Sequence, residues 1–106
     1  MAKFIKGDRV AVLYSPGYGA GWSTWNQDYA EDIIFDPAIA RLVDQGLDTT
    51  QAQLEQYLDD RYPDGYWGGL RDLTIKWVPA GARFRIEEYD GNETVIVEDD
   101  DVWFVA

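Results

Sequence analysis

The sequence predicts an α+β fold, with a mainly antiparallel β-sheet of four or five strands and two helices inserted between the first strand and a C-terminal β-meander. Two observations support this prediction. Apolar residues recur at helical spacing in the middle of the chain, over 36–61. The strand patterns after that region follow one another without an intervening helix, which is typical of antiparallel sheets. The length of 106 residues predicts one domain, 1–106.

The first strand and the first helix have clear local signals. Residues 10–14 are a short apolar, β-branched run, which predicts a buried strand. Asp36 and Pro37 begin the first helix, because aspartate caps a helix N-terminus and proline suits the first helical position. The apolar residues that follow share one helix face, and Gly46 ends the helix.

The second helix begins at one of two capping-box pairs, Asp48 with Gln51 or Thr50 with Gln53. It ends before Pro63, because the residue before a proline avoids the helical conformation. The apolar period then changes to two, which predicts strands. These strands cover residues 73–78, 83–88, 94–97 and 102–105, with turns at 79–81, 90–92 and 99–101.

The composition excludes several kinds of chemistry. The chain has neither cysteine nor histidine, which removes disulfides, thiolates and the most common general base and metal ligand. Carboxylates at Asp28, Glu31 and Asp32 are the remaining acid–base candidates, but acids are too frequent here to single them out. We therefore predict no catalytic residue, no cofactor and no metal. The lack of a signal peptide or an apolar span predicts a cytoplasmic protein with no membrane partner.

The charge is strongly negative and uneven. Twenty acidic residues against nine basic ones give a net charge of −11, and no basic residue follows Arg85. Direct binding to nucleic acid is not expected, because its phosphates would be repelled. The C-terminal acids are either a solubilising surface or a surface that imitates a phosphate backbone and binds a basic groove of a protein partner. They are Glu87, Glu88, Asp90, Glu93, Glu98, Asp99, Asp100 and Asp101.

Two segments rich in glycine and aromatic residues are the candidate site. We call 15–26 the first loop and 62–69 the second loop. Glycine turns bind anions through backbone N–H groups, aromatic rings stack on bases or sugars, and Arg71 could hold a phosphate. The residues expected to contact a nucleotide-type ligand are Tyr18, Gly19, Gly21, Trp22, Ser23, Thr24, Trp25, Asn26, Tyr66, Trp67 and Arg71. Alternatively, the tryptophans fill the core and Arg71 forms a surface ion pair; the sequence leaves open whether the loops meet.

The motifs SPGYGAGWSTW (15–25) and YPDGYWGG (62–69) resemble those of small uncharacterised proteins encoded by bacteriophages and prophages. Residues 77–79 and 84–91 resemble the same group. The resemblance implies a small acidic accessory protein in the cytoplasm of a bacterial host, where such proteins often act against host defences. It implies no functional residue.

Three hypotheses follow from these observations. The first is a non-enzymatic counter-defence protein that sequesters a small nucleotide-type ligand, and the glycine spacing favours it. The second is an acidic inhibitor, of the anti-CRISPR or anti-restriction type, that binds a host defence protein. The third is a structural phage domain whose aromatic loops form a homo-oligomer interface.

Overall fold

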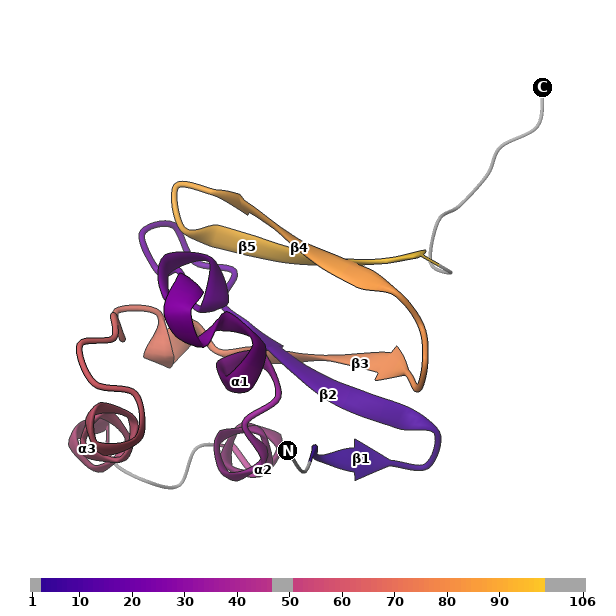
Figure 1. Ribbon diagram of the computed structural model, residues 1–106, viewed down its shortest axis with the longest axis horizontal. Helices are drawn as coiled ribbons and strands as arrows, with labels where there is room; N and C mark the ends of the chain where they lie inside the picture. The colour runs from indigo at the N-terminus through magenta and orange to yellow at the C-terminus, as the bar shows by residue number, and fades with distance from the viewer. Residues whose placement is uncertain (1–2, 47–50, 99–106) are drawn as a thin grey trace.

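The computed structural model describes residues 3–46 and 51–98, and it has the α+β architecture that the sequence predicts. The described strands and α-helices are shown in Figure 1. In chain order they are β1 (Ile5–Lys6), β2 (Arg9–Tyr14), α1 (Ala30–Ile34), α2 (Pro37–Asp44), α3 (Gln51–Arg61), β3 (Thr74–Pro79), β4 (Phe84–Tyr89) and β5 (Asn92–Val97). Three short 3-10 helices are η1 (Ser23–Trp25), η2 (Gln27–Tyr29) and η3 (Leu70–Asp72).

The five described strands pair in antiparallel fashion and are divided between two sheets. β2 lies between β1 and β3 in a three-stranded sheet, and β4 and β5 form a separate hairpin. The division follows the turn after β3, where Gly81 has a φ of +83° that favours glycine. The chain therefore leaves the first sheet at this turn instead of adding β4 to its edge.

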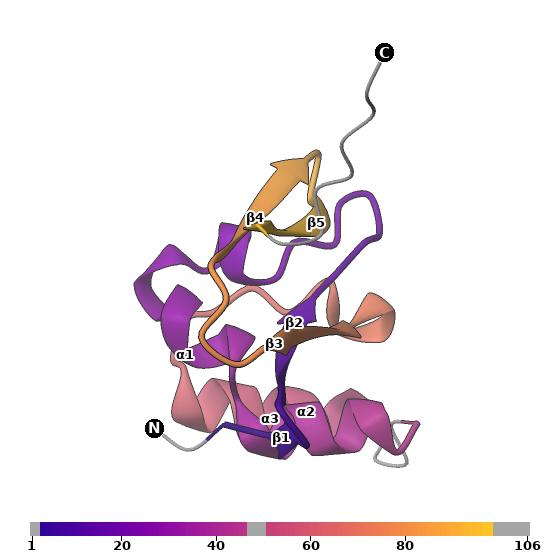
Figure 2. The same ribbon diagram turned by 90° about the vertical axis from the view of Figure 1, so that its right-hand side faces the viewer.

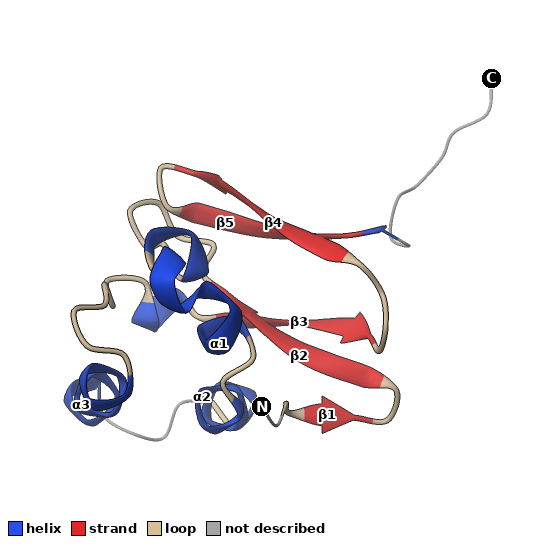
Figure 3. Ribbon diagram, viewed as in Figure 1, coloured by secondary structure: helices blue, strands red, loops and turns tan. Residues whose placement is uncertain are grey.

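Both faces of β2 are covered, because its side chains alternate between two apolar clusters. Figures 1 and 2 both place the β4–β5 hairpin on one side of β2 and β3 and place α2 and α3 on the other. Val12 and Val78 pack with Val95 and Val97 on the hairpin side. The larger cluster, on the helical side, contains Ala11 and Leu13 of β2 together with buried residues of α1, α2, α3 and both loops. The secondary structure is coloured in Figure 3.

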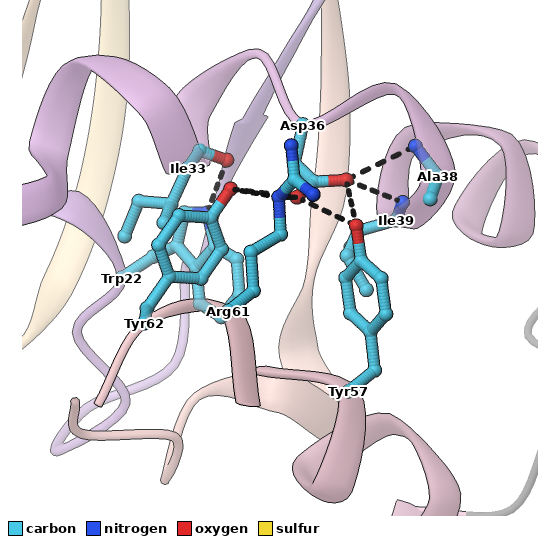
Figure 4. A network of polar contacts seen from close by, with 8 residues as sticks. All are labelled: Trp22, Ile33, Asp36, Ala38, Ile39, Tyr57, Arg61 and Tyr62. Carbon is cyan, nitrogen blue, oxygen red and sulfur yellow. Dashed lines mark hydrogen bonds and ion pairs between the residues drawn. The ribbon is translucent and has the colours of Figure 1, made fainter. Parts of the chain in front are cut away.

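Asp36 begins α2 as predicted and also joins α2 to α3. Its buried carboxylate accepts hydrogen bonds from the backbone N–H groups of Ala38 and Ile39, at 3.0 and 3.1 Å. Figure 4 shows that the same carboxylate also receives the hydroxyl groups of Tyr57 and Tyr62. The Tyr62 contact is the shorter, at 2.7 Å. This network fixes the C-terminal end of α3, from which the second loop starts.

The environment of Asp36 changes the acidity of the two tyrosines. Burial raises the pKa of Tyr62 well above its usual range, and the hydrogen bond to Asp36 raises it further. Burial and the negative charge of Asp36 also raise the pKa of Tyr57. Arg61 lies nearby, with its Nε atom 3.6 Å from an Asp36 oxygen. Both hydroxyl groups therefore stay neutral donors over the ordinary pH range.

The structure confirms most of the predicted elements and adds others. Pro37 occupies the start of α2, Gly46 adopts a φ of +93° just beyond its end, and α3 ends one residue before Tyr62. The end of the first loop forms η1, and the segment from there to α2 forms η2 and α1, none of which the sequence indicated. The predicted capping boxes require residues 47–50, and the predicted last strand covers 102–105; both lie outside the described residues.

None of the helices in 3–46 and 51–98 combines the length and the apolar character needed to cross a membrane.

Candidate binding site

Glu93 on β5 holds the first loop in place. The alternation of side chains along β5 turns Glu93 inward, and it is only 1% exposed. Its carboxylate accepts hydrogen bonds from the backbone N–H groups of Ser15 (3.0 Å), Trp22 (2.8 Å) and Thr24 (3.0 Å). The Thr24 hydroxyl donates a fourth. Because one carboxylate binds both ends of 15–24, it fixes the path of the whole loop.

Two glycines bring the first loop against the β4–β5 turn. Gly19 and Gly21 adopt φ values of +72° and +57°, which other residues reach only with strain. Their N–H groups donate to the backbone carbonyls of Asp90 and Gly91. A Cβ atom at Gly21 would lie 2.4 Å from the Trp25 ring. Glycine is therefore required at this position for the indole to pack directly on the backbone.

The two loops meet, mainly through the side chain of Asn26. Its amide nitrogen donates to the carbonyls of Trp22 and Tyr66, both at 2.8 Å, and its amide oxygen accepts from the Tyr66 N–H at 2.6 Å. The Tyr66 hydroxyl also donates to the Gly19 carbonyl at 2.7 Å. At the base of the loops, the Ser15 hydroxyl donates to the carbonyl of Gly69 at 2.9 Å.

Two of the aromatic residues predicted to bind a ligand belong to the core. Trp22 is completely buried and Trp67 almost so, and their ring centroids lie 5.4 Å apart. Each indole N–H has an internal acceptor, the Ile33 carbonyl for Trp22 and the Asp59 carboxylate for Trp67. This corrects the prediction that these two rings stack on a ligand, because neither offers a free face. Sequence reasoning could not separate them from the exposed rings, since all lie in similar loops.

The exposed aromatic residues gather at one end of the molecule. We define the aromatic tip as Tyr18, Trp25, Tyr66 and Tyr89, which are 74%, 41%, 40% and 71% exposed. Tyr18 and Tyr89 meet edge to face with ring centroids 6.4 Å apart, and Trp25 and Tyr66 are 5.1 Å apart. The Trp25 N–H donates to a Glu88 oxygen, at 3.1 Å, that also accepts from the β4–β5 turn.

A cleft of about 440 Å³ opens beside the aromatic tip, between the two loops. It is lined by Thr24, Trp25, Asn26, Gln27, Asp28, Tyr29, Pro63, Asp64 and Gly65. The Tyr29 hydroxyl donates to the Pro63 carbonyl at 2.9 Å and so joins its two walls. Of the predicted ligand contacts, Thr24, Trp25 and Asn26 line this cleft. The others do not, including buried Ser23 and exposed Arg71 on η3.

The structure corrects one residue of the predicted acidic surface. Glu87, Glu88, Asp90 and Glu98 are exposed, and Glu88 and Asp90 lie at the β4–β5 turn beside the aromatic tip. Asp99, Asp100 and Asp101 lie outside the described residues. Glu93 was predicted to lie on this surface, but it is buried, and its carboxylate accepts hydrogen bonds from the first loop. The available signal was its alternation with the valines of β5.

Nowhere in the part of the chain that the structure describes do three or more acidic side chains gather as a group that could hold a metal ion. Comparison of the chain with models of protein families, with curated proteins and with solved structures found no match.

Proposed function

We propose that this chain is a binding protein that recognises a basic surface of another protein through the aromatic tip. The observation that supports the proposal is the gathering of four exposed aromatic side chains from three separate segments, next to Glu88 and Asp90. Tyrosine and tryptophan are enriched at protein interfaces and at their energetic hot spots. The net charge of −11 would steer a basic partner toward this surface and would repel acidic ones.

Two of the four rings of the tip are held in place before any partner arrives. Tyr66 is fixed by its hydroxyl group on Gly19, and Trp25 by its N–H on Glu88 and by its packing on Gly21. A surface that is already ordered loses little side-chain entropy on binding, which favours affinity. Glycine loses more backbone entropy on folding than other residues do. The support of an ordered aromatic surface is a reason for the glycines of the first loop.

A nucleotide-type ligand is the second candidate, because Trp25 and Tyr66 are 41% and 40% exposed and leave aromatic surface that a base could contact. Phosphate recognition is less well supported. Asp28 and Asp64 line the cleft, and no basic residue is among its described lining residues. The negative charges of these two carboxylates would oppose the binding of a phosphate in the cleft. A protein partner therefore fits the charge of the tip better.

Affinity capture from a bacterial lysate tests the proposal with three forms of the protein. The double variant Tyr18→Ser/Tyr89→Ser removes the two most exposed rings of the tip. Ile5→Ser on β1 is the control, because it removes an exposed apolar side chain, 54% exposed, from a different element. We expect the parent and the control to capture the same basic protein, the double variant to lose it, and added salt to release it.

Equal capture by the double variant would contradict the proposal. Native mass spectrometry of the same purified parent provides the second reading. A nucleotide-sized adduct that survives purification would support the nucleotide-type ligand instead, and its loss from the double variant would assign the aromatic tip to that ligand.

A further inference from the structure

The cleft between the two loops is large enough to hold an organic group. Its volume of about 440 Å³ lies within the range of roughly 300–1,000 Å³ that is typical of sites for organic ligands. One wall comes from 24–29 and the other from 63–65, and the Tyr29–Pro63 hydrogen bond holds them together. An elongated organic group can enter such an open cleft from solvent.

Two carboxylates make this cleft negative. Asp28 and Asp64 come from opposite walls, both are exposed, and neither wall contributes a basic residue within the described chain. A positively charged group between them would be attracted from both sides, whereas an anion would be repelled. The overall charge of −11 adds to this preference.

Asp64 lies in a closely packed turn with an uncommon backbone conformation. It is one of two non-glycine residues with positive φ in the described chain, at +66°, in the turn that follows α3. Aspartate tolerates this conformation better than most residues do. The next residue, Gly65, packs so closely on the core that a Cβ atom there would lie 2.1 Å from Trp67. The close packing of Gly65 therefore fixes the backbone beside Asp64, which lines the cleft.

An aromatic wall completes the cleft. Trp25 exposes 41% of its surface, and the half-buried Tyr29, whose ring packs against that of Tyr62, also lines the cleft. Indole and phenol rings attract ammonium and guanidinium groups that lie over their faces. Guanidinium groups also stack flat on aromatic rings while they donate to carboxylates. The combination of two rings and two carboxylates favours a cation that is also planar or apolar.

From this combination, we infer that the cleft binds an organic cation, a guanidinium or ammonium group, and that this group is an arginine or lysine side chain of the protein partner. This inference rests on the proposed function, because it names the chemical group through which the protein partner is recognised. The aromatic tip would supply the broad contact area, and the cleft beside the tip would bind one basic side chain of the partner.

Titration followed by amide chemical shifts tests the inference with defined probes. The probes are N-acetyl-arginine amide, a short arginine-containing peptide, spermidine as a free polyamine, and adenosine monophosphate as an anionic control. We expect the arginine compounds to shift the amide signals of 24–29 and 63–65. The peptide should bind more tightly than the single amino acid, and adenosine monophosphate should leave these signals unchanged.

Variants of equal charge separate the cleft from the general acidity of the chain. Asp28→Asn/Asp64→Asn should weaken binding of N-acetyl-arginine amide about tenfold, which corresponds to the loss of about 1.4 kcal/mol. Asparagine also tolerates positive φ, so the turn at Asp64 is kept. Asp8→Asn/Asp60→Asn removes the same charge from positions that do not line the cleft, and it should change binding less than about twofold.

Each outcome has a separate meaning. No shift with either arginine compound, or equal weakening by both double variants, would overturn the inference. Tighter binding of spermidine than of the peptide would keep the cation site and overturn its assignment to a protein partner. The titration uses no partner, so its failure beside successful capture overturns the cleft alone. A successful titration beside capture that ignores the tip variant overturns the proposed function alone.

Discussion

Glu93 fixes the first loop through one buried carboxylate, so its replacement by glutamine tests how the loop is held. The glutamine amide has one oxygen, so when that oxygen accepts the N–H groups of Trp22 and Thr24, the NH₂ group faces the N–H group of Ser15. Donors that face donors in a buried place lose their hydrogen bonds and their solvation. We expect Glu93→Gln to lower the free energy of unfolding by about 3 kcal/mol, measured by urea unfolding.

The matched control is Glu87→Gln, which makes the same chemical change on the exposed face of β4. It should alter stability by no more than about 0.5 kcal/mol. Faster hydrogen exchange at the amides of Ser15, Trp22 and Thr24 in Glu93→Gln would locate the damage in the first loop. Identical unfolding midpoints for the two variants would contradict the assigned role of Glu93.

Single residues were predictable where their signal is local. Asp36 and Pro37 predict the start of α2, because a capping side chain bonds only to backbone N–H groups within the next three residues. Glu93 was misplaced because it stands among other acids in the sequence, and its partners are 69 to 78 residues away. Its alternation with Val95 and Val97 was the one local sign that the side chain turns inward.

At the scale of elements, the attachment of α3 to α2 through Tyr62 predicts a loss of stability at alkaline pH. The pKa of Tyr62 is raised in the folded chain, first by burial and then by its hydrogen bond to Asp36. Above about pH 10 the unfolded chain loses this proton while the folded chain keeps it. The unfolded state then binds fewer protons, so the free energy of unfolding falls as pH rises.

Urea unfolding at about pH 8, 10 and 11 measures this effect, and each such tyrosine contributes a slope of up to about 1.4 kcal/mol per pH unit. Tyr62→Phe should be less stable than the parent near pH 8, because it loses the bond to Asp36, but it should lose less stability above pH 10. Tyr18→Phe at the exposed tip is the control. Parallel pH curves for the parent and Tyr62→Phe would contradict the prediction.

Most elements were predictable because the spacing of their apolar residues and the capping and turn residues at their ends identify them. The strands after residue 73 and the helix from Pro37 have a clear apolar period and clear ends. The segment that forms η1, η2 and α1 has neither, because it mixes exposed acids with aromatic residues that pack in several directions. Its short turns are fixed by tertiary contacts such as those of Asn26, which no local pattern reveals.

For the whole molecule, the sequence indicated the candidate loops but not how they combine. The contact between Asn26 and Tyr66 joins positions 40 residues apart. Which rings enter the core and which form the tip depends on this contact and on the β4–β5 turn. The total charge was certain from the composition, while the convergence of Asp28 and Asp64 on one cleft required the three-dimensional structure.

The same charge predicts how the aromatic tip behaves toward a second copy of the chain. Two tips would bring Glu88 and Asp90 of both copies together, and the net charge of −11 on each copy would oppose the contact. Screening shortens the reach of this repulsion from about 30 Å at 0.01 M salt to about 3 Å at 1 M. Self-association through the tip should therefore rise with salt, whereas binding to a basic partner should fall.

Sedimentation velocity at low and high salt distinguishes these two uses of the tip. We expect the parent to sediment as a monomer of 12.1 kDa at low salt, because nothing then offsets the repulsion. A dimer at low salt that is abolished by Tyr18→Ser/Tyr89→Ser, but not by Ile5→Ser, would assign the tip to a homo-oligomer interface. Since binding to the basic partner should weaken with salt while self-association should strengthen, the salt dependence of capture and that of sedimentation together identify which of them the aromatic tip binds.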